Sequence, residues 1–381
     1  WLLPEGIEEV LPAEARRVER LRRRVLDLFD RWGYDLVMPP MLEYLESLLT
    51  GTAKELDLQT FKVTDQLTGR LMGIRADITP QAARIDAHYL KRTTPVRLCY
   101  IGPVVRTLPG EFAGSREPLQ LGAELYGHGG PESDVEIVQL MLAALSETGI
   151  PQCYLDLGHV GVFRGLARAA GLSAEQEADL FDALQRKAGP EVEAFVATLS
   201  CDQNIKRMLG ALVNLHGDEV LSRARQHLSG APADVIAALD NLEAVATRLR
   251  RALPEQPLHF DLAELHGYRY YTGVVFSALL PGYGMAIAQG GRYDDIGKAF
   301  GRARPAAGFG ADLRRLVNLV NEAPARRGGI AAPNRDDAAL HKEIARLRAQ
   351  GERVVVQLNG RDVDCDRELI QRDGDWTVVP I

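Results

Sequence analysis

The sequence is poor in cysteine, has no long apolar run and lacks an excess of positive charge. Its four cysteines lie far apart, without CxxC or other metal-ligand spacing, so we expect reduced thiols in a cytoplasmic protein and neither a metal site nor another cofactor. No segment approaches the roughly 18 apolar residues of a membrane-spanning helix, and no signal-peptide pattern is visible. The net charge of −7 argues against a general nucleic-acid binder.

The length of the chain and its glycine- and proline-rich breaks predict one large domain and one small domain. At 381 residues, with 46% hydrophobic and 25% charged residues, the composition is typical of a globular protein. Helical periodicity fills residues 162–253, which we interpret as a helical insertion in a domain covering residues 1–322. A Pro/Gly/Arg-rich segment at 323–336 indicates a linker, followed by a small α/β unit at 337–381.

Two adjacent tyrosines stand in a segment that reads as a strand. Residues 270–276 are rich in aromatic and β-branched side chains, and Gly273 marks a bulge or a close backbone approach. On a strand, Tyr270 and Tyr271 point to opposite faces, so one belongs in the core and the other faces a cavity. Alternatively, both are ordinary packing residues with satisfied hydroxyls.

Polar residues recur near two further predicted elements. Asp77 or Thr79 can cap a helix that starts at Pro80. Gln120 and Glu124 lie four residues apart on one predicted strand, hence on the same face. An acid and an amide in this arrangement indicate either a ligand site or a structural hydrogen-bond network.

These segments, in this order, resemble the catalytic domain of histidyl-tRNA synthetase. The resemblance covers residues 1 to about 320 and is most specific at 266–273, where the family has Arg-Gly-Leu-Asp-Tyr-Tyr-Thr-Gly, and at the Gly-Gly-Arg-Tyr-Asp of 290–294. It implies an α+β fold, with a class II aminoacyl-tRNA synthetase-type antiparallel sheet flanked by helices. It also implies a homodimer, formed through the predicted helix at 12–32 and the region of Pro40.

The resemblance also assigns roles to single residues. The acid and threonine of the family's histidine site correspond to Asp77 and Thr79, and the arginine that grips the α-phosphate of ATP corresponds to Arg106. Arg315 keeps the position of a second ATP-binding arginine. The implied histidine-binding set is Asp77, Thr79, Arg106, Gln120, Glu124, Tyr270 and Tyr271.

Three catalytic positions depart from the synthetase pattern. His266 replaces the catalytic arginine, Leu108 replaces a glutamate of the ATP-binding loop, and Arg314 replaces an acid in the last motif. Adenylation needs preorganised positive charge at the reacting phosphorus, so loss of the arginine should remove about 3 kcal/mol or more of transition-state stabilisation. The C-terminal unit is also too short for an anticodon-binding domain.

A degenerate synthetase without an anticodon domain resembles the regulatory subunits of ATP phosphoribosyltransferase. This resemblance implies a non-catalytic chain that partners a short-form ATP phosphoribosyltransferase catalytic subunit at the first step of histidine biosynthesis and takes part in feedback inhibition by histidine. No tRNA partner is expected, because the helical insertion shows no basic stripe. The alternatives are a compact histidyl-tRNA synthetase, which would catalyse ATP–pyrophosphate exchange with histidine, and an enzyme that adenylates another amino acid.

Overall fold

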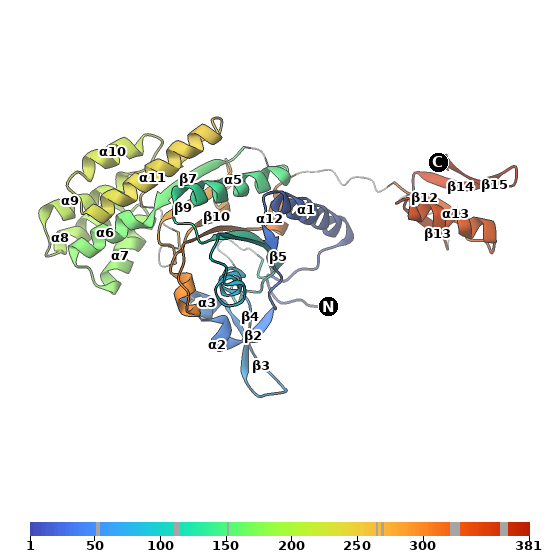
Figure 1. Cartoon of the computed structure of the whole chain (residues 1–381), viewed down its shortest axis with the longest axis horizontal. Helices are drawn as coiled ribbons and strands as arrows, with labels where there is room; N and C mark the ends of the chain where they lie inside the picture. The colour runs from blue at the N-terminus through green and yellow to red at the C-terminus, as the bar shows by residue number, and fades with distance from the viewer. Residues whose placement is uncertain are drawn as a thin grey trace. The chain divides into compact units, whose positions relative to one another are not determined.

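The chain divides into two compact units, Trp1–Val320 and Asn321–Ile381 (Figure 1). The computed structural model describes residues 1–50, 54–109, 115–150, 152–263, 266–267, 270–320, 328–358 and 365–381. In this part of the chain, no helix is both long and apolar enough to cross a membrane. The same residues contain no group of three or more His, Cys, Asp or Glu side chains placed to hold a metal ion.

The first unit is built on an eight-stranded sheet with the order β1-β5-β6-β11-β10-β9-β7-β8. The strands are β1 (Asp35–Leu36), β5 (Val96–Pro103), β6 (Leu119–Tyr126), β7 (Tyr154–His159), β8 (Leu258–Phe260), β9 (Val274–Leu279), β10 (Ala286–Arg292) and β11 (Ala306–Asp312). The six central strands are antiparallel, whereas the two edge strands pair parallel to their neighbours. The predicted synthetase-type antiparallel sheet is therefore confirmed.

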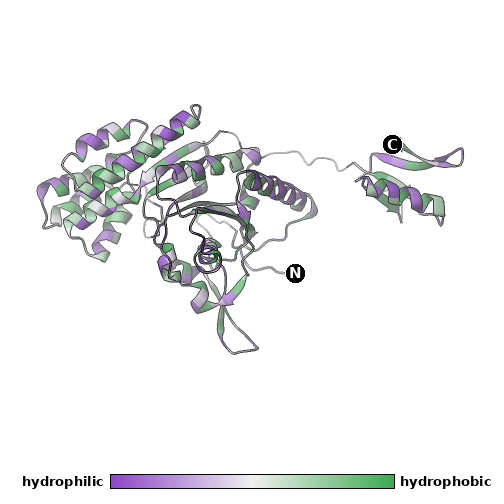
Figure 2. Ribbon diagram, viewed as in Figure 1, coloured by the Kyte–Doolittle hydropathy of each residue, from purple (hydrophilic) through white to green (hydrophobic). Residues whose placement is uncertain are grey.

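Three helices, α1 (Pro12–Arg31), α5 (Pro131–Glu147) and α12 (Leu313–Leu319), cover one face of this sheet. Alternation along β6 decides which residues they cover, since Leu121, Ala123 and Leu125 join the core beneath the helices. The predicted helix at 12–32 is confirmed as α1, with an apolar stripe in the core and a hydrophilic outer side (Figure 2). Gln120 and Glu124 consequently lie on the opposite face of the sheet.

That opposite face is bordered by short elements from the first third of the chain. A small sheet with the order β2-β4-β3 is formed by β2 (Leu42–Tyr44), β3 (Phe61–Thr64) and β4 (Leu71–Ile74). The helices α2 (Leu45–Leu48), α3 (Lys54–Gln59) and α4 (Thr79–Arg84) accompany it. Helix α4 continues into the π-helix η1 (Ile85–Leu90), which lies near the 3₁₀ helix η3 (Ile296–Phe300).

A helical layer separates β7 from β8 in the sequence. It consists of α6 (Val160–Ala170), α7 (Ala174–Gln185), α8 (Gly189–Thr198), α9 (Gln203–Ala211), η2 (Leu212–Asn214), α10 (Val220–His227) and α11 (Ala233–Ala252). Helix α7 begins with a capping box between Ser173 and Gln176. The all-helical character predicted for residues 162–253 is therefore confirmed, with the first helix beginning at Val160.

In its described residues, 328–358 and 365–381, the second unit contains a four-stranded sheet with the order β13-β12-β14-β15 and one helix. Its elements are β12 (Ile330–Pro333), α13 (Ala338–Ala349), β13 (Val354–Gln357), β14 (Arg367–Arg372) and β15 (Asp375–Pro380). The prediction of a linker at 323–336 is wrong at Ile330–Pro333, because Ile330 and Ala332 are fully buried in the core of this unit. Residues 323–327 of the predicted linker lie outside the described residues. The overall composition of the segment is typical of a linker, but the segment includes the short apolar strand β12.

Candidate functional site

Asp77 and Thr79 lie where the chain enters α4. The carboxylate Oδ1 of Asp77 accepts hydrogen bonds from both the backbone N–H and the hydroxyl of Thr79, each at 3.0 Å. Neither residue is the N-cap, because Ile78 occupies that position and Thr79 is the first helical residue. The predicted cap is therefore wrong by position, although Asp77 still satisfies one amide of the first helical turn.

Gln120, on β6, connects the segment that precedes α4 to the sheet. Its side-chain Nε2 donates to Asp77 Oδ1 at 2.7 Å, and its Oε1 accepts from the backbone N–H of Ile78 at 2.9 Å. The side-chain amide thus uses both ends to hold the loop against β6. Asp77, Thr79 and Gln120 are all half-buried, so part of this group remains accessible.

Glu124 lies deeper on the same face of β6 and is only 1% exposed. Its carboxyl group accepts a hydrogen bond from Tyr100 Oη at 2.8 Å and another from the Tyr293 hydroxyl. Tyr100 Oη is also 3.0 Å from the hydroxyl of Thr79. Burial raises the pKa of Glu124 to about 8, an effect that the two tyrosine donors oppose. The carboxyl group of Glu124 therefore loses its proton at a higher pH than an ordinary glutamate does.

These contacts form one continuous network, which we call the acid–tyrosine cluster. Its members are Asp77, Thr79, Tyr100, Gln120, Glu124 and Tyr293. Two glycines make room for it on neighbouring strands. A Cβ atom at Gly308 would meet Glu124 Oε2 at 1.5 Å, and one at Gly122 would meet Tyr100 Oη at 2.4 Å.

Tyr270 and Tyr271 border the cluster but do not lie on a strand. Their backbone N–H groups donate to Gly267 O at 2.8 and 3.0 Å, and β9 begins only at Val274. The prediction that they point to opposite faces is wrong, because Gly267 has a positive φ of 61° and starts a turn here. The predicted close approach at Gly273 is confirmed, since a Cβ there would lie 2.9 Å from Cδ of Arg292.

The rings of the two tyrosines pack together beside the cluster. Tyr270 stacks on Tyr293 with ring centroids 5.1 Å apart, and it meets Tyr271 edge-on at 5.2 Å. The hydroxyl of Tyr270 is buried and has no hydrogen-bond partner among the described residues. A buried hydroxyl without a partner is costly, so this position favours a role in holding a ligand.

The three residues that depart from the synthetase pattern, His266, Leu108 and Arg314, have different surroundings in the structure. His266 Nδ1 lies 3.3 Å from the Ser277 hydroxyl, and burial lowers the pKa of this imidazole below its usual 6.5. His266 is therefore neutral at pH 7 and cannot replace a permanently charged guanidinium. Leu108 is 65% exposed, and Arg314 donates to the backbone oxygen of Glu117 at 3.2 Å.

Arg106 and Arg315 lie outside the cluster. Arg106 Nε donates to the backbone oxygen of Ala76 at 3.4 Å, which places it next to the loop that carries Asp77. Arg315 Nε donates to Tyr283 Oη at 2.9 Å, and its guanidinium carbon is 4.9 Å from the centre of that ring. The structure thus brings Asp77, Thr79, Gln120 and Glu124 into one network, with Tyr270 at its side and Arg106 near its edge.

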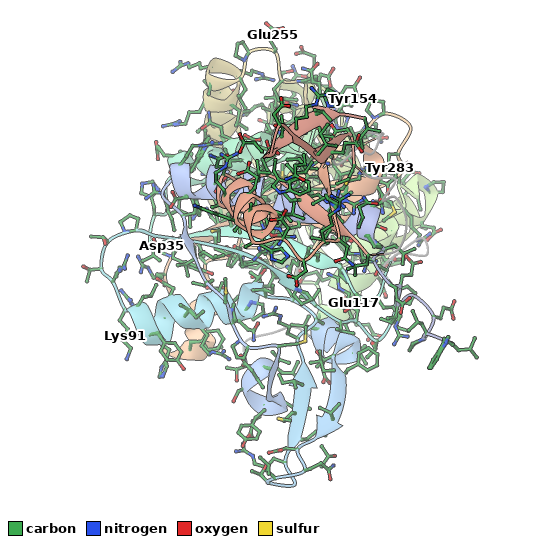
Figure 3. All side chains as sticks on the ribbon, turned by 90° about the vertical axis from the view of Figure 1, so that its right-hand side faces the viewer. Asp35, Lys91, Glu117, Tyr154, Glu255 and Tyr283 are labelled. Carbon is green, nitrogen blue, oxygen red and sulfur yellow. The ribbon has the colours of Figure 1, made fainter. Side chains whose placement is uncertain are left out.

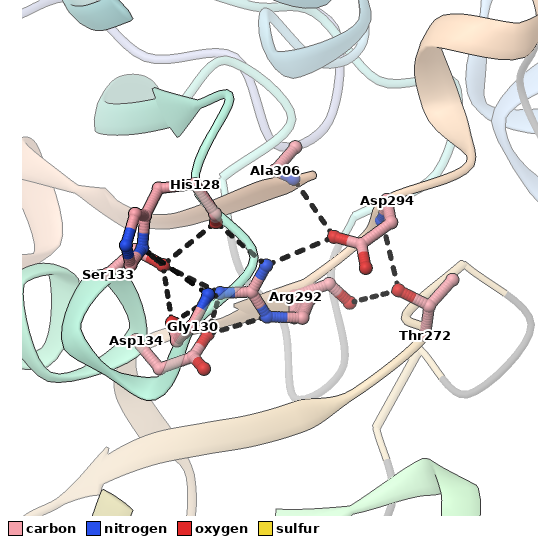
Figure 4. A network of polar contacts seen from close by, with 8 residues as sticks. All are labelled: His128, Gly130, Ser133, Asp134, Thr272, Arg292, Asp294 and Ala306. Atoms are coloured by element: carbon pink, nitrogen blue, oxygen red, sulfur yellow. Dashed lines mark hydrogen bonds and ion pairs between the residues drawn. The ribbon is translucent and has the colours of Figure 1, made fainter. Parts of the chain in front are cut away.

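The Gly-Gly-Arg-Tyr-Asp segment contributes a second buried network, centred on Arg292 (Figure 4). The guanidinium group makes five hydrogen bonds, to side chains or carbonyl groups of His128, Gly130, Ser133, Asp134 and Asp294. Because three of these residues lie at the start of α5, Arg292 joins that helix to the end of β10. The Gly-Gly-Arg-Tyr-Asp segment, one of the two most specific matches to the synthetases, therefore has a structural role.

Sequence reasoning missed Tyr100 and Tyr293 as parts of the site. Tyr293 stands inside the matched segment, and Tyr100 lies directly opposite Gly122 in the sheet. Only the pairing of β5 with β6 reveals that the Tyr100 side chain can cross a glycine to reach Glu124. Two surface hollows, of about 480 and 430 Å³, occur elsewhere, and neither is lined by the acid–tyrosine cluster.

Two family models together match nearly the whole chain. A model of histidyl-tRNA synthetase matches residues 6–316, and one of the ATP phosphoribosyltransferase subunit HisZ C-terminal domain matches residues 327–379. The ATP phosphoribosyltransferase regulatory subunits of Pseudomonas syringae pv. syringae and Azotobacter vinelandii are each 58% identical to this chain. In both cases the match covers 100% of this chain and 98% of the relative.

Solved structures agree with this relationship. A protein from Bacillus halodurans, described as an ATP phosphoribosyltransferase regulatory subunit/histidyl-tRNA synthetase, superposes with a TM-score of 0.82 at 31% identity. That match covers 96% of this chain and 95% of the other. Histidyl-tRNA synthetase from Nostoc, at 20% identity, gives a TM-score of 0.80 over 100% of this chain and 97% of its own, and supports the fold alone.

Proposed function

The chain belongs to the family of ATP phosphoribosyltransferase regulatory subunits, and we propose that it binds free histidine in the acid–tyrosine cluster. It is accordingly a non-catalytic regulatory subunit acting in histidine biosynthesis, and its synthetase-like fold reflects a paralogous relationship. The bound histidine would signal to a short-form catalytic subunit as the source of feedback inhibition. The observation that carries the proposal is the retained cluster around Glu124 beside degenerate catalytic positions.

The chemistry of the cluster suits the two polar ends of histidine. Half-buried Asp77, Thr79 and Gln120 offer oxygen acceptors to an ammonium group. Deeper in the site, Glu124 and the Tyr270 hydroxyl offer partners to the two nitrogen atoms of an imidazole ring. Since the cluster is filled by its own side chains, binding would exchange some of these internal hydrogen bonds for bonds to the ligand.

The proposal excludes aminoacylation by this chain. A neutral, buried His266 supplies no positive charge to a developing phosphorane, which is the stabilisation that adenylation requires. We expect no ATP–pyrophosphate exchange above background when the protein is supplied with histidine, ATP and Mg²⁺. Exchange at the rate of a parallel histidyl-tRNA synthetase control would overturn the regulatory assignment of the site and favour a compact synthetase.

We also propose a homodimer formed through α1 and the β1 edge. β1 is the outer strand of the eight-stranded sheet, and the side chains of Leu36, Met38 and Leu42 are 43%, 76% and 46% exposed. Exposed apolar residues beside an open strand edge are typical of a protein interface. Light scattering should give twice the chain mass, and Met38→Asp should shift the protein toward monomer. A monomeric wild-type protein would contradict the dimer.

Calorimetric titration with histidine tests the ligand assignment. Micromolar binding to the isolated chain would establish a sensor whose inhibition is a conformational signal to its partner. Binding only in the presence of the short-form catalytic subunit would contradict an autonomous pocket and direct the search to the subunit interface. Glu124→Ala should abolish histidine sensing while the two subunits still assemble, which size-exclusion chromatography of the mixture can check.

A further inference from the structure

A basic hollow lies between η1 and η3, and no member of the acid–tyrosine cluster belongs to its lining. Its volume is about 430 Å³, within the range of small-molecule sites. Ala87, His88 and Lys91 line one side and Phe300, Gly301 and Arg302 the other. We propose that this η1–η3 hollow binds a small phosphorylated anion, an activity that does not rest on the proposed histidine site.

The charge around the hollow is opposite in sign to that of the whole chain. Lys91 and Arg302 are permanent cations at neutral pH, and no acidic residue belongs to the lining. The chain as a whole carries −7, so a concentration of positive charge here runs against the average. Lys91 lies at the outer surface of the molecule (Figure 3). An approaching anion would therefore meet positive charge first.

Ion pairs and carbonyl contacts hold the basic rim in place. Arg304 forms a buried ion pair with Asp86 of η1 at 3.1 Å, so this carboxylate is paired with a cation. Arg302 Nη2 donates to the backbone oxygen of Arg92 at 2.5 Å, and Arg304 Nη1 donates to the same oxygen at 2.9 Å. The two segments that form the hollow are therefore tied together, which lowers the entropic cost of binding.

Two local features accompany the hollow. Lys91 is the C-cap of η1 and has the left-handed conformation, φ 50°, that glycine usually adopts at a helix end. Arg302 Nη1 is buried and has no hydrogen-bond partner in the described part of the chain. The preceding π-helix is itself a type of element found often at functional sites.

The helix ends oppose an anion, but less strongly than the side chains attract it. The carboxyl ends of η1 and η3 face this region, and each contributes at most about half a negative charge in a full-length helix. Both helices are short, and Lys91 and Arg302 each carry a full positive charge. A multiply charged phosphate group, rather than a monovalent carboxylate, is therefore the ligand class that the balance favours.

Titration of the full chain with inorganic pyrophosphate, followed by calorimetry at low ionic strength, tests the proposal. Lys91→Asn removes the charge and keeps a residue that tolerates φ above zero. We expect about tenfold weaker binding in this variant, because one charge-assisted hydrogen bond is lost. Lys298→Ala is the matched control, since Lys298 is exposed on η3, pairs with Asp295 at 2.7 Å and does not line the hollow.

Further titrations distinguish the possible classes of anion and test whether another site on the chain binds it. Ribose 5-phosphate binding tighter than inorganic phosphate would support a phosphoester ligand, whereas equal binding would support a free inorganic anion. Unchanged pyrophosphate binding in Lys91→Asn and Arg302→Gln, or its loss in Arg106→Ala alone, would overturn the assignment. Acetate binding as tight as that of phosphate would exclude the phosphate class, and no pyrophosphate binding at millimolar concentration would end the proposal.

Discussion

The acid–tyrosine cluster and the Arg292 network are both buried polar groups on the same sheet, but they differ in how their atoms are paired. Arg292 makes five hydrogen bonds, as many as a guanidinium has N–H donors. The cluster instead places Glu124, whose pKa burial raises to about 8, beside a buried Tyr270 hydroxyl that has no partner among the described residues. In the Arg292 network, Oδ2 of Asp134 is also buried without a described partner, and burial raises the pKa of Asp134 to about 6. Full pairing of the central guanidinium indicates structural support, whereas an unpaired Tyr270 hydroxyl at the side of a partly accessible cluster indicates a ligand site.

The largest effect is expected from Arg292→Met. Removing the cation leaves buried Asp134 without its charged partner, which costs about 3–5 kcal/mol of the free energy of unfolding. Arg248→Met is the matched control, because its ion pair with Glu132 at 2.7 Å is exposed and contributes little to stability. Urea unfolding of both variants measures the difference. Equal losses of unfolding free energy in the two variants would show that the buried Arg292 network contributes no more to stability than an exposed ion pair.

Histidine affinity should depend on Glu124 rather than on the Arg292 network. Glu124→Gln keeps the volume of the side chain but replaces an oxygen that the cluster uses as an acceptor with an N–H donor. We expect histidine binding to weaken by about a hundredfold, with little loss of folding stability. Calorimetric titration measures the affinity, and urea unfolding checks the fold. A Glu124→Gln protein that binds histidine normally would remove the distinction between the two networks.

The pH dependence of stability gives a smaller effect with a defined sign. The pKa of Glu124 is about 8 in the folded state against 4.5 for an ordinary glutamate, so the folded protein holds this proton more tightly. The stabilisation is complete below pH 4.5 and is lost as the pH rises toward 8.

Compared with Glu124→Gln, the wild-type protein should therefore lose on the order of 2 kcal/mol between about pH 6.5 and pH 8. Urea unfolding of both proteins at the two pH values gives this difference. Parallel stability curves would mean that Glu124 is ionised in the folded protein throughout this range.

The sequence predicted the parts of the molecule that local patterns determine. The apolar stripe of α1, the periodicity of the helical insertion and the alternation of β6 each depend on neighbouring residues, and all three are found in the structure. The common face of Gln120 and Glu124 follows from the same alternation. Their prediction as ligand residues came from the resemblance to the synthetases and stays a prediction.

The parts that the sequence did not predict depend on long-range contacts or on a single turn. Tyr293 donates a hydrogen bond to Glu124, which lies 169 residues away in the sequence, and no local sequence pattern predicts such a partner. The turn at Gly267 overrides the strand propensity of Tyr270 and Tyr271, because the two backbone N–H groups bond to one carbonyl oxygen. In the second unit, burial of Ile330 determines β12 despite a composition that favours a linker.

The smallest effect, and the sharpest test of the comparison, is expected from Tyr270→Phe. The change removes only a buried hydroxyl that has no partner in the described chain, so stability should change by less than about 1 kcal/mol. Histidine affinity should fall about five- to tenfold if that hydroxyl contacts the ligand. Tyr293→Phe is the matched control, because its hydroxyl donates to Glu124 and its loss should cost about 1–2 kcal/mol without ligand. Urea unfolding and calorimetry of the two variants separate these outcomes, and equal destabilisation would mean that the Tyr270 hydroxyl is already satisfied in the free protein.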